Sequence, residues 1–214
     1  MNTHSKLRVA FFSAVVVAAP IADAYVVNIT PSNPRAIYLR VGDGTMSGGT
    51  YNSGGTPTNG GAVPQIRAVV PANTVGNGVP QVMTTPNNPR LTSDLDGFLF
   101  CNSGQVYVGG FYRATAGGGP MANAARLLVT APANLVNADG QAIPIPQISW
   151  TSSGIGDTGA QPIPAGSFTA GQTQLTSFPR NTWRESCLTF RYSNQNLVAA
   201  GTYEATVTFT LTQP

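Results

Sequence analysis

Two aspartates close together in the chain are the first residues whose type and spacing could support chemistry. Asp94 and Asp96 lie two residues apart, and in an extended strand this spacing places both carboxylates on one face. A pair of carboxylic acids can hydrolyse glycosides, and carboxylate oxygens can also bind Ca²⁺ weakly. The surrounding stretch, residues 93–97, reads SDLDG, which is typical of a polar turn. We therefore predict a turn here, with no catalytic residues and no metal site.

Two cysteines and two tryptophans are the other residues whose side chains could have a chemical or binding role. Cys101 and Cys187 are expected to form one disulfide if the chain is exported, with two free thiols or a metal pair as the alternatives. Trp150 ends an alternating apolar run and is expected in the core. Trp183 lies among arginines that could stack on it, and we expect it at the rim of the fold. A sugar-binding platform at Trp183 is the functional alternative.

The first 24 residues have the pattern of a secretory signal. Lys6 and Arg8 precede an apolar run that ends in Ala22-Asp23-Ala24. This run is shorter than the roughly 20 residues of a membrane span and contains Pro20. We predict cleavage after Ala24 and export of the remaining chain.

Loss of the signal would also remove His4 and Lys6, the only histidine and the only lysine of the 214-residue chain. The commonest general base and the usual amine nucleophile are then absent, and no catalytic or cofactor motif replaces them. We predict that the protein is not an enzyme and has no cofactor. Its remaining positive charge is a small, dispersed excess of arginine, which does not match a nucleic-acid-binding surface.

The C-terminal run from Gly201 to Pro214 has the clearest secondary-structure pattern. Its apolar residues share one parity, and threonines and one glutamate occupy the other. Side chains alternate with period two in a strand, so this run predicts a strand with one buried face. The apolar parity comprises Tyr203, Ala205, Val207, Phe209 and Leu211.

The rest of the chain predicts a single all-β domain over residues 36–214, preceded by a short arm at residues 25–35. Short apolar runs recur between glycine and proline clusters, a spacing typical of a β-sandwich. The expected strands lie at residues 36–41, 63–70, 79–84, 97–101, 106–113, 126–130, 145–151, 167–170, 172–177 and 186–192. In the first of these, Ile37, Leu39 and Val41 share one side and Tyr38 and Arg40 the other. Residues 42–61 are rich in glycine and predict a flexible surface loop. Only residues 121–128 have a helix-like composition, enough for a turn or two.

At its C-terminal strand the chain resembles the subunits of bacterial chaperone–usher pili, in which an alternating last strand carries a glycine fourteen residues from its end, here Gly201. The signal, the cysteine pair, the threonine-rich strands and the single-domain size are also similar. The resemblance implies an immunoglobulin-like sandwich without its final strand. A periplasmic chaperone fills the resulting groove first, and the N-terminal arm of the next subunit then replaces it.

In this sequence the resemblance assigns the donor strand to Tyr25, Val27 and Ile29. It assigns the groove to Gly201, Tyr203, Ala205, Val207, Phe209 and Leu211. The expected function is a structural subunit of a surface pilus, polymerised by strand exchange and used for adhesion or biofilm formation. Its expected partners are other pilins, a periplasmic chaperone and an outer-membrane usher. The alternative is a self-complete secreted sandwich, acting as a tip adhesin or carbohydrate-binding module through Trp183 and the 42–61 loop.

Overall fold

The computed structural model describes residues 26–58, 63–86, 90–115 and 123–214. The described residues contain no α-helix, and they include no helix long and apolar enough to cross a membrane. The signal prediction and Tyr25 lie outside them. In chain order the elements are β1 (Val27–Asn28), β2 (Ala36–Val41), β3 (Met46–Ser47), β4 (Thr56–Pro57), the 3₁₀ helix η1 (Ala72–Thr74), β5 (Gln81–Val82), β6 (Val106–Arg113), β7 (Ala125–Ala131), β8 (Asn134–Val136), β9 (Ala142–Pro144), the 3₁₀ helix η2 (Ile145–Gln147), β10 (Ile148–Ser153), β11 (Gly166–Ser167), β12 (Gly171–Phe178), β13 (Thr182–Tyr192) and β14 (Thr208–Thr212).

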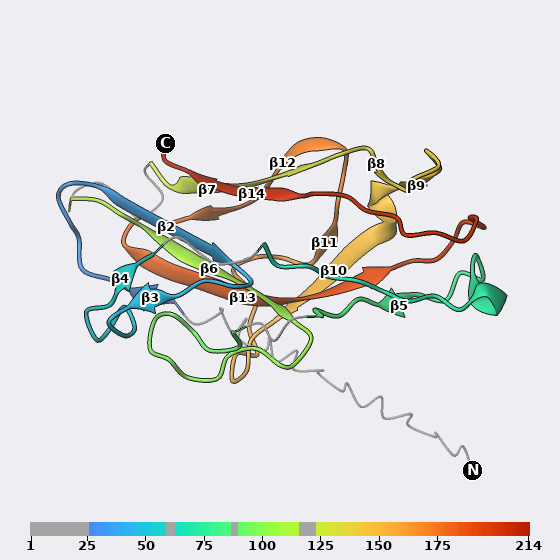
Figure 1. Cartoon of the computed structure of the whole chain (residues 1–214). Helices are drawn as coiled ribbons and strands as arrows, with labels where there is room; N and C mark the ends of the chain where they lie inside the picture. The colour runs from blue at the N-terminus through green and yellow to red at the C-terminus, as the bar shows by residue number, and fades with distance from the viewer. Residues whose placement is uncertain (1–25, 59–62, 87–89, 116–122) are drawn as a thin grey trace, which may run out of the picture.

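The larger sheet is antiparallel and has the order β11-β10-β13-β6-β2 (Figure 1). Its longest strand, β13, pairs with β6 over residues 182–186 and with β10 over residues 187–192. Two short strands occupy parts of the remaining edges: β1 pairs with residues 182–183 and β5 with residues 191–192. This leaves β2 as the outer strand on one side of the sheet.

The smaller sheet has the order β12-β7-β14 and lies across the larger one (Figure 1). Its central strand, β7, alternates between buried and less buried residues, so that one face points into the molecule. The last strand, β14, pairs only with β7 as far as the structure describes the chain. The prediction of an all-β sandwich is therefore confirmed.

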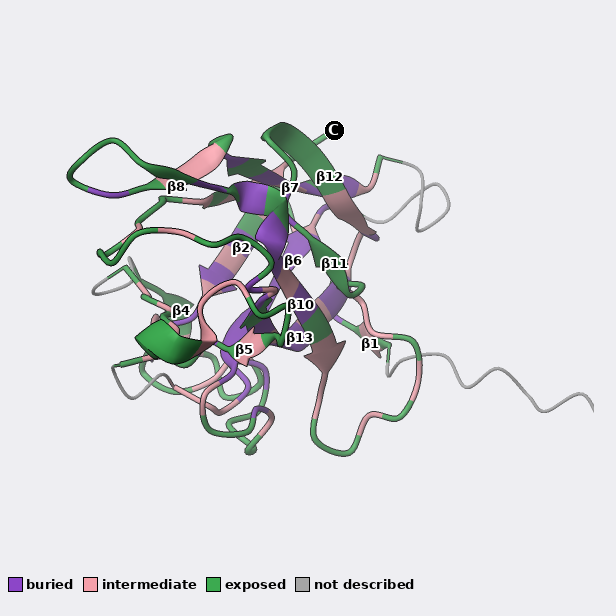
Figure 2. Cartoon of the chain, turned by 90° about the vertical axis from the view of Figure 1, so that its right-hand side faces the viewer, coloured by how far each residue is buried: buried purple, intermediate pink, exposed green. Residues whose placement is uncertain are grey.

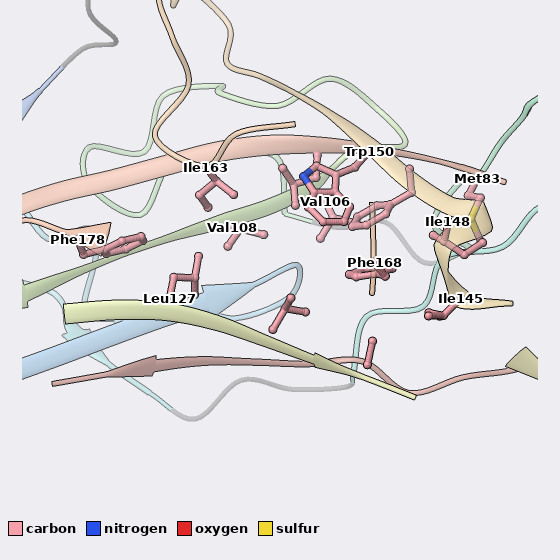
Figure 3. Packing of buried hydrophobic residues seen from close by; sticks show 14 of the residues in the cluster. Met83, Val106, Val108, Leu127, Ile145, Ile148, Trp150, Ile163, Phe168 and Phe178 are labelled. Atoms are coloured by element: carbon pink, nitrogen blue, oxygen red, sulfur yellow. The ribbon is translucent and has the colours of Figure 1, made fainter. Parts of the chain in front are cut away.

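The main core fills the space between the two sheets (Figure 3). The inward-facing residues of the alternating strands form this core. Leu127 and Val129 of β7 face Val108 of β6 and Leu188 of β13, and all four are at most 1% exposed. Seven of the eight residues of β6 are nevertheless buried, which alternation against a single partner layer cannot produce. The outer face of the larger sheet must therefore be covered as well, and Figure 2 shows β6 and β13 buried within the molecule.

Two loops, residues 42–58 and 90–101, contribute to a second cluster on that outer face. Met46 is 5% exposed, and Tyr51 packs its ring against those of Phe111 and Trp183 at centroid distances of 5.2 and 5.4 Å. Most of residues 42–58 are exposed, as expected of a surface loop, but the segment also contains the β3–β4 hairpin, which was not predicted. Its two large apolar side chains, Met46 and Tyr51, anchor the glycine-rich turns on the sheet.

The strand predictions succeed where main-chain partners exist. The strand at residues 106–113 is confirmed, and β7, β10, β12 and β13 overlap the predicted runs. Residues 63–70 and 97–101 instead form one isolated bridge each, Arg67 with Thr84 and Leu99 with Thr92. Ile66 and Val70 still pack on the core, so the alternation marks burial correctly although the main chain is barely paired. The helix-like composition at 121–128 is misleading, because β7 begins at Ala125.

Candidate functional site

The C-terminal run has one apolar and one polar face, as its alternation predicts, and its second half forms β14. Phe209 lies opposite Val129 of β7, and Leu211 lies opposite Leu127. The side chains of Phe209 and Leu211 pack against the main core yet are only partly buried, while Thr210 between them is exposed. The apolar face of this strand is therefore covered on one side only.

The first half of the run is not a strand. Between Gly201 and Val207 the only bridge joins Glu204 to Val136 of β8, and Ala205 is exposed. Tyr203 is half-buried, and its hydroxyl lies 3.1 Å from two acceptors, the side-chain oxygen of Gln141 and the carbonyl of Ala199. The prediction of one continuous strand from Gly201 is thus wrong, because β7 has already ended where this segment would need a partner. Gly201 itself makes a close approach, since a Cβ there would lie 3.1 Å from Asn137 Nδ2.

A second edge strand lies beside β14. β2 contacts β14 across the sandwich, and Ile37 of β2 is in register with Tyr112, whose ring belongs to the main core. Ile37, Leu39 and Val41 therefore face inward, yet Ile37 is 38% exposed and the other two are half-buried. We call the partly exposed apolar residues of these two edges the edge seam: Ile37, Leu39, Val41, Val207, Phe209 and Leu211.

The edge seam carries no charged side chain. The one charged residue of β2, Arg40, points to the opposite face of its sheet and is buried there. The described chain places no further strand along the outer edges of β2 and β14. Unpaired main-chain groups beside a row of apolar side chains can accept an added strand, with hydrogen bonds giving affinity and alternate side chains giving register.

The N-terminal arm does not lie in this seam. Val27 pairs with Trp183 at the start of β13, and Ile29 donates its amide hydrogen bond to the Asn181 carbonyl at 2.9 Å. Ile29 is 8% exposed and belongs to the cluster on the outer face of the larger sheet. The donor role of Val27 and Ile29 remains a prediction, which requires them to leave this position.

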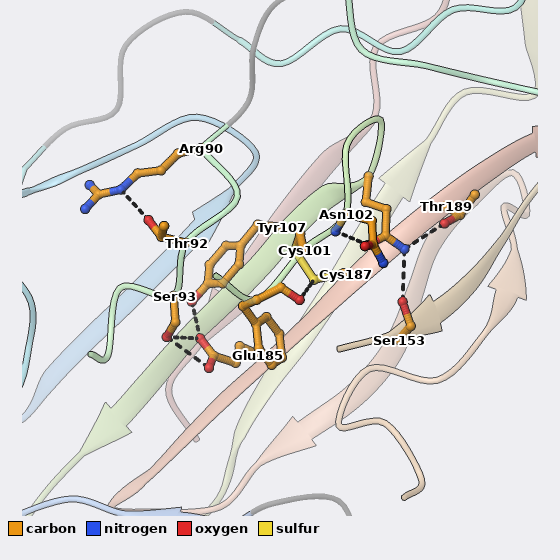
Figure 4. Close-up of a disulfide and its surroundings, with 12 residues drawn as sticks. Arg90, Thr92, Ser93, Cys101, Asn102, Tyr107, Ser153, Glu185, Cys187 and Thr189 are labelled. Atoms are coloured by element: carbon orange, nitrogen blue, oxygen red, sulfur yellow. Dashed lines mark hydrogen bonds between the residues drawn. A yellow bond between two sulfur atoms is a disulfide. The ribbon is translucent and has the colours of Figure 1, made fainter. Parts of the chain in front are cut away.

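The predicted disulfide between Cys101 and Cys187 is present and joins the 90–101 loop to β13 (Figure 4). Beside it, the Glu185 carboxylate accepts hydrogen bonds from the Ser93 hydroxyl, the Tyr107 hydroxyl and the Trp183 indole. Burial raises the pKa of Glu185, and these three donors oppose that shift. Burial likewise raises the pKa of the Tyr107 hydroxyl.

The two aspartates occupy a turn, as predicted, but one side chain is buried and the other is exposed. Asp94 is fully buried, where it accepts from Tyr38 and forms an ion pair with Arg40 at 2.6 Å. Asp96 is exposed and accepts the amide hydrogen of Phe98 within its own turn. The two carboxylates are thus not presented together on one face. Within the described ranges, no group of three or more histidine, cysteine or acidic residues could hold a metal.

The expectation for Trp183 is wrong. Its side chain is 1% exposed rather than at the rim, and its ring lies 5.6 and 6.0 Å from those of Phe111 and Tyr38. No face of the indole is open to a sugar, so Trp183 is a structural residue in this conformation. Trp150 lies in the main core, as expected.

Sequence reasoning missed the polar contacts that dock the 90–101 loop. Tyr38 and Arg40 share a parity on β2, opposite its apolar residues, and that parity predicts solvent exposure rather than burial. A usable signal was the run VYVGGFY in β6, because a nearly continuous apolar strand is typical of burial on both faces. It implies that residues on the outer face, including Arg40, need partners.

Comparison of the chain with protein-family models, curated proteins and solved structures returned no match. Its function must therefore be inferred from its own geometry.

Proposed function

We propose that the protein is a structural subunit of a surface pilus, which polymerises when an extended strand from another subunit adds to the edge of β14. The observation that carries this proposal is the edge seam: inward-facing apolar side chains of two neighbouring edge strands are left partly exposed. An added strand would pair with β14 and bury those side chains with its own alternate residues.

The strand order supports an immunoglobulin-like sandwich that lacks one strand. In such a domain, strands A, B, E and D form one sheet and strands C, F and G form the other. Here β10-β13-β6-β2 reads D-E-B-A, and the β7-β14 pair of the smaller sheet reads C-F, in the correct chain order. β12, on the other side of β7, is a strand that this scheme does not contain. Position G falls beside β14, where no described residue forms a strand.

The composition of β14 is also consistent with an edge that is meant to be paired. Natural edge strands are commonly protected from aggregation by charges, prolines or bulges. β14 reads TFTLT, with none of these features. A periplasmic chaperone would cover such an edge during export, an outer-membrane usher would pass the subunit on, and the arm residues Tyr25, Val27 and Ile29 of the next subunit would then take the chaperone's place.

The positions of Asp94 and Asp96 are also consistent with a structural role rather than with catalysis by a pair of acids. Asp94 is engaged with Arg40, and Asp96 lies apart from it in solvent. Both thiols are consumed in the disulfide. Adhesion or biofilm formation would be a property of the polymer.

A charge placed in the edge seam tests this proposal. Ile37→Asp should reduce polymer yield at least tenfold, because the added strand would have to bury an unpaired carboxylate. Since Ile37 is already 38% exposed, the subunit itself should remain folded. The subunit is co-produced with a periplasmic pilus chaperone, and polymer is measured as a ladder of bands on an unheated denaturing gel.

The matched control is Val69→Asp, which places the same charge at a residue that is 81% exposed. Its polymer yield should equal that of the unmodified chain. Equal yields from Ile37→Asp and Val69→Asp would remove the edge seam as the site of strand addition. A soluble monomer that forms no ladder and binds glycan would instead favour the self-complete adhesin.

A further inference from the structure

The arm that would be donated to another subunit is already seated on its own subunit. Val27 and Asn28 pair with Trp183 and Thr182, and the Ile29 amide donates to the Asn181 carbonyl. The same edge of β13 is taken up by β10 only from Cys187 onward. The arm thus occupies a separate, short stretch of edge at the start of β13.

The floor under the arm is formed without it. The rings of Tyr38, Tyr51, Phe111 and Trp183 contact one another at centroid distances from 5.2 to 6.0 Å. The Trp183 indole is fixed independently by its hydrogen bond to Glu185 at 2.9 Å. Removal of the arm therefore uncovers an apolar slot but leaves the residues that line it in mutual contact.

The arm itself is held by few main-chain contacts. β1 is two residues long, and Val26 before it is 48% exposed. After Ile29, the next main-chain hydrogen bond to the body runs from the Ser32 amide to the Ala114 carbonyl at 3.2 Å. Burial of Ile29 in the slot adds to these bonds, because its side chain is almost fully covered.

We propose that the arm is a latch, seated at the start of β13 in the unassembled subunit, which must be released before it can enter the edge seam of another copy. This inference rests on the proposed function, since it concerns the same arm residues. Val27 and Ile29 cannot fill their own slot and another subunit's seam at once. The two positions exclude each other, and release of the latch must therefore precede assembly.

A disulfide lock tests the latch. Asn28 faces Thr182, and the hydrogen-bonding pair Ile29–Asn181 beside them makes Asn28–Thr182 a non-hydrogen-bonded pair. Such pairs have Cα atoms about 4.5 Å apart, which suits a disulfide. In the double variant Asn28→Cys/Thr182→Cys, the new bond should form within the monomer under mild oxidation, and peptide mass spectrometry identifies it.

The locked chain should form at least tenfold less polymer than the single variants Asn28→Cys and Thr182→Cys, which are the matched controls. A mild reductant should restore the yield, since the native Cys101 and Cys187 are both fully buried and stay paired. Failure of the new bond to form, or undiminished polymer from the locked chain, would overturn the latch. Failure of the proposed function has a different signature, namely that Ile37→Asp leaves polymer yield unchanged.

Discussion

Asp94→Asn should be among the most destabilising conservative substitutions in this chain. The Asp94 and Arg40 side chains are 0% and 1% exposed, and their charged atoms lie 2.6 Å apart. Arg40 also donates to the Gly42 and Arg90 carbonyls, which accept hydrogen bonds but do not neutralise its charge. The substitution would thus leave a guanidinium buried without its closest counter-charge.

Removal of one partner from a buried ion pair costs about 3 to 5 kcal/mol, because the remaining charge is desolvated and uncompensated. For a domain of this size, each kcal/mol lowers the melting temperature by about 2 to 4 °C. The expected loss is therefore about 6 to 20 °C, measured by thermal unfolding of the purified protein with circular dichroism. Replacing Arg40 by methionine as well should recover part of that loss, since no charge then remains unpaired.

Asp96→Asn is the internal control, because it makes the same chemical change two residues away on an exposed side chain. Surface substitutions of this kind usually change stability by no more than about 0.5 kcal/mol. The reasoning is refuted if both variants melt within about 2 °C of the unmodified chain, a span set by the same conversion. That result would mean that the Arg40 charge is solvated or neutralised in another way.

Two further predictions concern the same outer face. Burial raises the pKa of Glu185, so the folded chain keeps the carboxyl proton of Glu185 to a higher pH than the unfolded chain does. The free energy of unfolding that this proton contributes is therefore present in acid and is lost as pH rises through the pKa of the folded state. Urea unfolding between pH 4 and 8 should show Glu185→Gln gaining relative to the unmodified chain as pH rises, and a constant difference would contradict the assignment. The double variant Cys101→Ala/Cys187→Ala opens a link between residues 86 apart and should lose about 4 to 5 kcal/mol in the loop-entropy model. A loss under about 1 kcal/mol in urea unfolding would show that the buried contacts hold the 90–101 loop without the bond.

The parity of each strand was readable from the sequence, but the number of layers was not. Phe209 and Leu211 face inward and their threonine neighbours face outward, as alternation requires. Alternation says which residues share a face, yet it cannot say what covers that face. The partner of β14 and the open edge beyond it come from long-range pairing, which no local pattern encodes.

The residues that cover the outer face of the larger sheet were not predicted from the sequence, for a related reason. Met46 and Tyr51 are isolated large side chains in a glycine-rich segment. A prediction from the average composition of the segment does not detect that these two residues are anchored. Trp183 has polar neighbours in the chain, and Arg40 lies on the parity of its strand opposite to the apolar residues, so both patterns indicate positions near solvent. In the structure each is buried by a loop that is remote in sequence, so tertiary packing overrides the local pattern.

A sandwich that leaves one edge open must hold its shape by contacts away from that edge, and the outer layer supplies them. The disulfide, the Glu185 hydrogen bonds and the Arg40–Asp94 ion pair all lie on the face of the larger sheet that is turned away from the smaller sheet. They fix β2, β6 and β13 to one another and to the 90–101 loop whether or not a strand has been added beside β14. For the proposed pilus function, this arrangement would keep the seam open for an added strand without loss of the sheet that forms one wall of the seam. The variants that weaken the outer layer should therefore lower the melting temperature but leave polymer yield unchanged at temperatures where they are folded. Ile37→Asp should instead leave the melting temperature nearly unchanged and reduce polymer yield.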